Sequence, residues 1–285
     1  MLAPSEASRG CGVLQDYRDM TDAQHEALEK QTLFTIVHAL QEYSKEAKRI
    51  FDTAPADSEA EVIVVAEDVV QYAIEVAEVY AIDERFAGFT DYKRVRWMPT
   101  PFGLFPQALL VDAKASKEDY RANLQRSQLP MDVDMIVKSK PPRPHTVLAG
   151  LPPHLEIRVR GGRLPAATTS VFAHLHYADV AHPEEGGVVR DLRNIIAFCI
   201  PHQRFKHIYN PSPDVGFWRK GKEAPGLGEK VRIRVSFEAL AAQCRWRFQR
   251  LSYADGSGSY TAPIWRDTDS SGNPVDERFD FIGRG

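Results

Sequence analysis

The chain has 285 residues, of which 43% are hydrophobic, and this is enough to bury a sizeable core in one large domain or two small ones. No apolar run approaches the roughly 18 residues of a membrane span, which argues against an integral membrane protein. The net charge is −3, but residues 1–90 hold 7 Lys/Arg and 18 Asp/Glu, whereas residues 201–250 hold 11 and 4. A basic face built from the later chain fits binding to backbone phosphates, and ordinary scatter of surface charge is the alternative.

The cysteines and the N-terminus indicate a reducing compartment. Cys11, Cys199 and Cys244 make an odd count without CxxC spacing, which argues against a disulfide framework or a zinc site. Residues 1–15 lack the basic-then-apolar layout of a signal peptide and are expected to form a disordered leader. We therefore expect a cytoplasmic protein, in which Cys199 is a small core residue rather than a nucleophile.

Two helices are predicted in the first third of the chain. Residues 21–51 carry apolar side chains at near-helical spacing, with Thr21 or Asp22 as the N-cap. Residues 61–80 form a second helix with a broad apolar stripe. Glu67 lies on this second helix and could supply a supplementary carboxylate to a site on a neighbouring sheet, although most acidic helix residues are simply solvated.

Residues 85–116 predict two strands joined by a proline-rich turn. Asp91 lies on the first strand, and Asp112 and Lys114 follow the apolar run of the second. Because side chains alternate along a strand, Asp112 and Lys114 face the same side, and Asp91 reaches the same place if the strands are neighbours. Burying charged side chains at the end of such a strand costs desolvation free energy unless they have a partner or a function. The alternative to a functional site is therefore a structural Asp–Lys ion pair.

This combination of residues has a specific chemistry. Mg²⁺ prefers oxygen ligands, and Asp91, Asp112 and the backbone carbonyl of Ala113 would make a partial oxygen cage for it. Lys114 would orient the attacking water and offset the charge that develops on a phosphate. The D-x(n)-D-x-K pattern is weak by itself, and it gains weight from the apolar strand and from the basic cluster that follows Asp91.

The same residues carry a family resemblance. The strings FAGFTDYKRVRW and LLVDAKAS resemble the core of SfiI-like type II restriction endonucleases, within the PD-(D/E)xK nuclease superfamily. The resemblance extends through residues 29–51, 61–80 and 124–132, and it thins afterwards. One departure from the superfamily pattern is Thr90, which stands where a proline is usual. Thr90 is not at a ligand position, so the chemistry is not put in doubt.

The resemblance implies an α/β restriction-endonuclease-like fold, with a mixed central sheet flanked by helices and a β-rich DNA-recognition region. Residues 16–285 would form a single domain, with a catalytic core at about 16–135 and a recognition and oligomerisation region at about 145–285. It also implies Mg²⁺-dependent hydrolysis of double-stranded DNA by a homotetramer, a dimer of dimers that binds two copies of GGCCNNNNNGGCC. The alternatives are a nuclease of DNA repair or junction resolution and a non-catalytic DNA-binding protein.

The later chain predicts loops and strands. Residues 117–127 are expected to form a helix, and the family resemblance implies that Arg121 on this helix contacts DNA. The proline-rich residues 138–153 are expected to be irregular. The predicted strands are residues 155–160, 168–177, 194–200, 230–237 and 245–253.

Two of these strands alternate basic and apolar residues, RIR and RWR, with one face charged and the other packed. Such a ribbon can enter a major groove, where arginine reads guanine. The family resemblance assigns base readout to Arg232 and Arg234, with Lys222 from the preceding loop. His174 and His176 share a strand face at metal-ligand spacing, but no third ligand is near in the sequence, so a structural or surface role is favoured.

Overall fold

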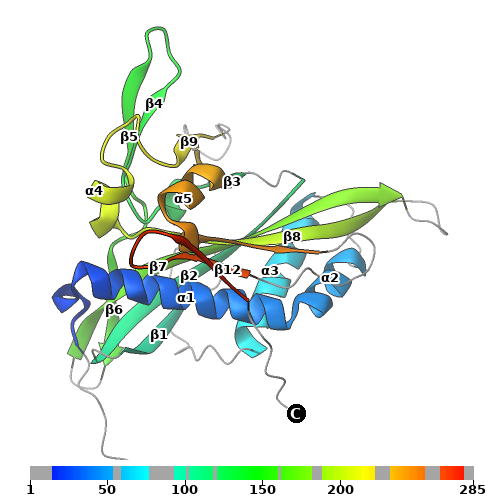
Figure 1. Cartoon of the computed structure of the whole chain (residues 1–285), viewed down its shortest axis with the longest axis horizontal. Helices are drawn as coiled ribbons and strands as arrows, with labels where there is room; N and C mark the ends of the chain where they lie inside the picture. The colour runs from blue at the N-terminus through cyan, green and yellow to red at the C-terminus, as the bar shows by residue number, and fades with distance from the viewer. Residues whose placement is uncertain are drawn as a thin grey trace, which may run out of the picture.

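A computed structural model gives the arrangement of the helices and strands (Figure 1). It describes residues 15–53, 59–76, 93–100, 103–117, 121–159, 162–181, 188–221, 232–253 and 264–278. Residues 1–14 of the predicted leader, and also Asp91 and Lys222, lie outside the described residues.

A mixed sheet, with six strands among the described residues, forms the centre of the protein. The strands follow the order β1-β2-β7-β8-β11, and β6 pairs with the first part of β7. β2 and β7 run parallel, whereas the other described pairs of this sheet are antiparallel. The bounds are Lys93–Thr100 for β1, Gly103–Ser116 for β2, His154–Val159 for β6, Gly162–Ala181 for β7, Val188–Ile200 for β8 and Phe248–Ser252 for β11. The expected α/β fold with a mixed sheet is confirmed.

The N-terminal helices cover one face of this sheet. A short 3-10 helix, η1 (Tyr17–Asp19), leads into α1 (Asp22–Glu42), α2 (Ser44–Thr53) and α3 (Glu59–Val76). Thr21 caps α1 as predicted, in a reciprocal pair with Gln24. The single helix predicted over residues 21–51 is wrong, because the chain leaves helical geometry at Tyr43 before α2 begins. None of the described helices combines the length and apolar character that a membrane crossing needs.

The core between the helices and the sheet explains why β2 is so apolar. Leu109, Val111 and Ala113 point toward α1 and α3 and are buried there with Val171 and Ala197 of the neighbouring strands. The residues between them therefore point to the opposite face of the sheet. Asp112 and Lys114 are among these.

The opposite face carries the β-rich part of the chain. A three-stranded antiparallel sheet follows the order β3-β10-β9, and a second core joins it to the central sheet through Phe172 and Phe198. The elements on this face are β3 (Arg121–Leu124), η2 (Arg126–Gln128), η3 (Gln203–Phe205), α4 (Lys206–Tyr209), β9 (Trp218–Lys220), β10 (Ile233–Ser236) and α5 (Phe237–Gln243). In Figure 1 β3, β9, α4 and α5 lie above the central strands, and α1 crosses the view in front of the sheet.

The helix predicted over residues 117–127 is wrong. The segment instead forms β3 and the 3-10 turn η2. Ala122 and Leu124 are buried on one face of β3, with Asn123 between them on the other, so this short run follows the two-residue period of a strand. Pairing with β10, more than 100 residues later, decides its conformation, and no local signal reveals that partner.

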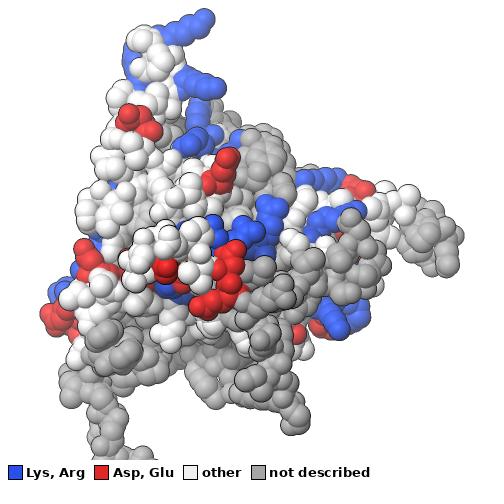
Figure 2. Space-filling view, viewed as in Figure 1, with Lys and Arg blue, Asp and Glu red and all other residues white. Residues whose placement is uncertain are grey.

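A hairpin projects from the β-rich side (Figure 1). It consists of β4 (Val133–Val137) and β5 (Arg143–Val147), so the expectation that residues 138–153 are irregular is wrong over β5. Pro144 is tolerated because β5 is an edge strand of a two-stranded sheet with β4. The proline nitrogen, which has no N–H to donate, can face away from the partner strand. Lys138, Lys140 and Arg143 are exposed near the turn. Figure 2 shows basic side chains at the tip and along one side of this projection.

The last described segments close the far edge of the sheet. Residues 245–253 do not form one strand as predicted: Arg245–Arg247 is a 3-10 helix, η5, and β11 begins at Phe248. β12 (Ile264–Thr268) and β13 (Pro274–Arg278) form a hairpin, and the Gln249 side chain of β11 bonds to the backbone of Arg266 in β12. The remaining predicted strands are confirmed in type, although β7 and β8 are longer than predicted.

Candidate active site

The end of β2 brings two of the three predicted catalytic residues together. The Nζ atom of Lys114 lies 2.6 Å from Oδ2 of Asp112, and the two side chains are 25% and 15% exposed. Both extend from the sheet face that carries the β-rich part of the chain. Lys114 stands opposite His174 in the parallel register with β7, and Asp112 stands opposite Phe172. A partly desolvated carboxylate–ammonium pair therefore lies at the edge of a buried strand.

Gln128 fixes the Asp112 carboxylate from a second direction. Its Nε2 donates a hydrogen bond of 2.9 Å to Oδ1 of Asp112. Its own Oε1 accepts a hydrogen bond of 2.9 Å from the backbone N–H of Gln125, which anchors the amide on η2. Gln128 is only 8% exposed. Sequence reasoning missed this residue; a Gln125-x-x-Gln128 capping pattern was the available signal.

The third predicted residue, Asp91, lies outside the described residues. The described part of β1 begins at Lys93, two positions later, and Lys93 lies opposite Leu110, two positions before Asp112. The two strands are therefore neighbours, as the prediction for Asp91 requires. Among the described residues no group of three His, Cys, Asp or Glu side chains could hold a metal ion.

An oxygen-liganded divalent cation fits the residues present. Asp112 offers hard carboxylate oxygens at a partly open position, and the ammonium of Lys114 lies beside them. The backbone carbonyl of Ala113 lies between them in the chain. Glu67 sits half-buried on α3, which packs against the face of β2 that bears Val111 and Ala113. A supplementary role for Glu67 would need it to reach around the strand end.

The histidines of β7 have protein partners. Nε2 of His174 lies 3.2 Å from Oγ of Ser116, and the ring meets Phe237 edge-on at 5.6 Å between centroids. His176 pairs with the Asn194 amide at 2.9 Å through Nδ1. Both environments support the structural role favoured from the sequence.

The small sheet presents a basic face, as its alternating sequence predicted. Ile233 and Val235 of β10 are fully buried, and Arg232 and Arg234 alternate with them and are partly exposed. Arg234 stands opposite Asn123 of β3 and Arg219 of β9, so these three positions form a row across the sheet. Arg219 was not identified from the sequence.

Arg121 and Lys222 are the two other predicted DNA contacts. Arg121 begins β3 rather than lying on a helix, opposite Ser236 of β10, and its side chain is outside the described set. Lys222 follows directly on Gly221, the last described residue after β9. Their roles as DNA contacts stay predictions.

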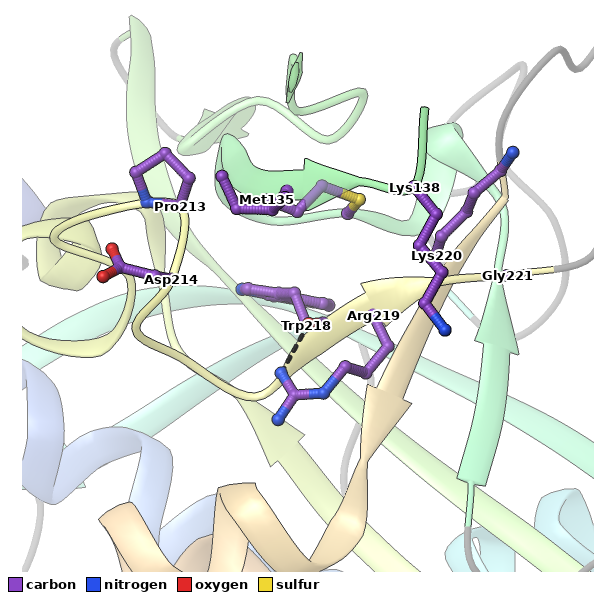
Figure 3. Close-up of a pocket in the computed structure, with 9 residues that line it drawn as sticks. Met135, Lys138, Pro213, Asp214, Trp218, Arg219, Lys220 and Gly221 are labelled. Atoms are coloured by element: carbon purple, nitrogen blue, oxygen red, sulfur yellow. Dashed lines mark hydrogen bonds between the residues drawn. The ribbon is translucent and has the colours of Figure 1, made fainter. Parts of the chain in front are cut away.

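A cleft of about 520 Å³ separates β9 from β4 (Figure 3). Met135 and Trp218 contribute apolar lining, and Lys138 and Lys220 lie on the side away from Asp214. The guanidinium of Arg219 bends back and donates a hydrogen bond of 2.7 Å to the carbonyl of Trp218, drawn as a dashed line in Figure 3. It also donates to the carbonyl of Gly216 at 3.0 Å.

The second predicted basic ribbon, RWR, has a different role from the one expected. Arg247 is completely buried, and its Nη2 donates to Oε2 of Glu29 on α1 at 2.7 Å. Glu29 is also fully buried, and its other oxygen accepts from the backbone N–H of His202. The guanidinium lies 4.2 Å from the Trp246 ring centre and 4.7 Å from that of Tyr209. Arg247 therefore joins the N-terminal helix to the later chain and is not available to read DNA.

Comparison with known proteins identifies the family. Residues 39–251 match the family described as Type II restriction enzyme SfiI. The Type II restriction enzyme SfiI of Streptomyces fimbriatus is 52% identical over 271 residues, which cover 95% of this chain and 99% of that protein. The crystal structure of tetrameric restriction endonuclease SfiI bound to cognate DNA matches with a TM-score of 0.86 at 52% identity, again covering 95% and 99% of the two chains.

The crystal structure of restriction endonuclease BglI bound to its DNA recognition sequence matches with a TM-score of 0.60, covering 80% of this chain and 90% of that one. At 16% identity this likeness concerns the fold, and it agrees with the mixed sheet and its helices. The matched segment in the SfiI comparisons contains β2, η2 and the small sheet. The chain therefore belongs to the SfiI family of type II restriction endonucleases.

Proposed function

We propose that this chain is a Mg²⁺-dependent endonuclease that cuts double-stranded DNA at an interrupted palindrome, GGCCNNNNNGGCC. The observation that carries the proposal is the Asp112–Lys114 pair, held by Gln128 at the end of β2 on the side of the Arg-bearing small sheet. A non-catalytic DNA-binding module has no need of this arrangement. The identity of 52% over 95% of the chain to a type II restriction enzyme supports the same function.

Asp91, Asp112 and the carbonyl of Ala113 hold the metal in this proposal. The β1–β2 register supports the pairing of the two carboxylates, because Lys93 and Leu110 face each other. Bound Mg²⁺ would supply Lewis-acid polarisation of the scissile phosphate and lower the pKa of a water molecule. Lys114 orients the attacking water and stabilises negative charge on the phosphate oxygens. Gln128 keeps the Asp112 oxygens in one orientation throughout.

We propose DNA contacts at Arg121, Lys222, Arg232 and Arg234, which belong to or follow the strands of the small sheet. Arginine on a β-ribbon can donate two hydrogen bonds to guanine O6 and N7. The assembly would be a homotetramer that binds two DNA sites, by analogy with SfiI, which crystallised as a tetramer bound to cognate DNA. Residues 16–285 would act as one domain, since β8 and β11 complete the sheet that β1 and β2 begin.

The test is digestion of a sequenced phage DNA with Mg²⁺, beside Ca²⁺ and EDTA controls. The expected result is discrete fragments whose ends lie within GGCCNNNNNGGCC, with Mg²⁺ only. Discrete fragments that map elsewhere would support site-specific endonuclease activity and contradict the proposed recognition sequence. Random degradation would favour a repair nuclease, and no cleavage by folded protein that still binds DNA would favour a non-catalytic DNA-binding protein.

A further inference from the structure

A row of polar side chains crosses the small sheet next to the proposed reading residues. Asn123 of β3, Arg234 of β10 and Arg219 of β9 occupy directly opposed positions in two antiparallel pairs. Their neighbours Leu124, Ile233 and Trp218 are buried on the other face. The row therefore stands on strands fixed by a packed core, and its side chains share one face.

Asn123 contacts the guanidinium of Arg234 directly. Nε of Arg234 donates a hydrogen bond of 3.2 Å to Oδ1 of Asn123. An arginine has five N–H donors in a planar fork, and a bond at Nε restricts the rotamers that the fork can adopt. Because Asn123 uses only Nε, the terminal Nη1 and Nη2 groups can still donate to two acceptors at once.

Gly221 and Arg219 leave the side-chain oxygen of Asn123 accessible to Arg234. A Cβ atom on Gly221 would lie 3.0 Å from Oδ1 of Asn123 and 2.8 Å from the carbonyl oxygen of Arg232, so the glycine keeps this space open. Arg219, across the row, is bonded to the carbonyls of Gly216 and Trp218 of its own strand. Its guanidinium is therefore held by other acceptors.

We propose that Asn123 is a positioning residue for sequence recognition: its side-chain oxygen holds the guanidinium of Arg234 in the orientation that reads a guanine edge. The ligand is a base with two adjacent acceptors, as guanine presents in the major groove. Without the acceptor, the long Arg234 side chain samples several rotamers and loses part of its discrimination between bases. The inference rests on the proposed reading role of Arg234.

The test measures binding to the cognate duplex and to duplexes with single G·C pairs replaced, in Ca²⁺ so that the DNA stays intact. The variants are Asn123→Leu, which removes the acceptor at similar size, Asn123→Asp, which keeps one, and Arg234→Ala. Asn123→Leu should lower the ratio of cognate to substituted affinity about 10-fold at the position that Arg234→Ala also affects, the order expected for one hydrogen bond to a charged group. Asn123→Asp should restore most of that ratio.

A double variant separates positioning from a general effect on folding. Asn123→Leu added to Arg234→Ala should cause no further loss of discrimination, because both changes remove the same contact. Equal weakening on all duplexes by Asn123→Leu, or unchanged discrimination in a variant with wild-type melting temperature, would overturn the inference while leaving Arg234 as a reading residue. If Arg234→Ala itself leaves discrimination intact, the proposed role of Arg234 fails and the inference falls with it.

Discussion

Replacing Gln128 by methionine tests how far the Asp112 carboxylate depends on its neighbour. Methionine keeps the length of the side chain and removes the N–H that donates to Oδ1 of Asp112 at 2.9 Å. Asp112 would keep its 2.6 Å contact with Lys114 but lose the bond at Oδ1, and its carboxylate could then rotate out of the geometry that a metal requires.

The magnitude follows from the type of bond lost. A hydrogen bond to a charged group contributes about 1.5–3 kcal/mol net, and each 1.4 kcal/mol is a factor of about ten in an equilibrium or rate constant. This gives a loss of about 10–100-fold, the same range that is typical when a residue orienting a metal ligand is removed. The loss should be found in the cleavage rate, in the Mg²⁺ concentration for half-maximal cleavage, or divided between them.

The assay is single-turnover cleavage of a cognate duplex across a Mg²⁺ titration, with DNA binding measured separately in Ca²⁺. Gln71→Met is the matched control, because Gln71 on α3 donates a similar bond of 2.7 Å to Glu75 away from Asp112. The control should cleave like the wild type. A folded Gln128→Met protein with wild-type rate and wild-type Mg²⁺ dependence would refute the role assigned to Gln128.

The other predictions concern the buried polar groups. Glu29→Gln removes the nearer carboxylate of the fully buried Arg247 and leaves only Glu26 at 3.8 Å, so it should lower the free energy of unfolding in urea by about 3 kcal/mol; a loss under about 1 kcal/mol would contradict the pairing. Burial lowers the pKa of His202 from 6.5 to about 4, against the opposing effect of its bond to the Pro153 carbonyl. Between these values the unfolded chain binds a proton that the folded chain excludes, so the free energy of unfolding should fall by up to about 3 kcal/mol as the pH drops from 6.5 to 4. His202→Gln should flatten that dependence, and an unchanged slope would contradict it.

The elements with a strong local pattern were predictable from the sequence. The β1–β2 hairpin, the capped helix α1 and the placement of Asp112 and Lys114 on one face follow from alternation and apolar runs. The alternating RIR of β10 also predicted a charged face over a buried one. In each case the spacing of a few neighbouring residues is enough to predict the secondary structure and the face that each side chain occupies.

The elements that depend on distant partners were not predictable. Arg245-Trp246-Arg247 has the same alternation as the RIR of β10, yet Arg247 is buried because Glu29, 218 residues away, supplies a carboxylate. β3 is a strand only because β10 lies beside it. The Gln125-x-x-Gln128 pattern indicates a cap but not a contact with Asp112, and no pattern marks Asn123, since the significance of both residues comes from the residue each one contacts.

The most direct test compares cleavage and binding in one pair of variants, Asp112→Asn and Lys114→Met, on the same cognate duplex. If these residues perform the chemistry, each variant should lose at least about 100-fold in cleavage rate with Mg²⁺, since single groups that stabilise transition-state charge contribute on this scale. Affinity for the duplex in Ca²⁺ should stay within about tenfold of wild type. A folded Asp112→Asn protein that cuts at the wild-type rate and positions would contradict the assignment of the active site to the end of β2.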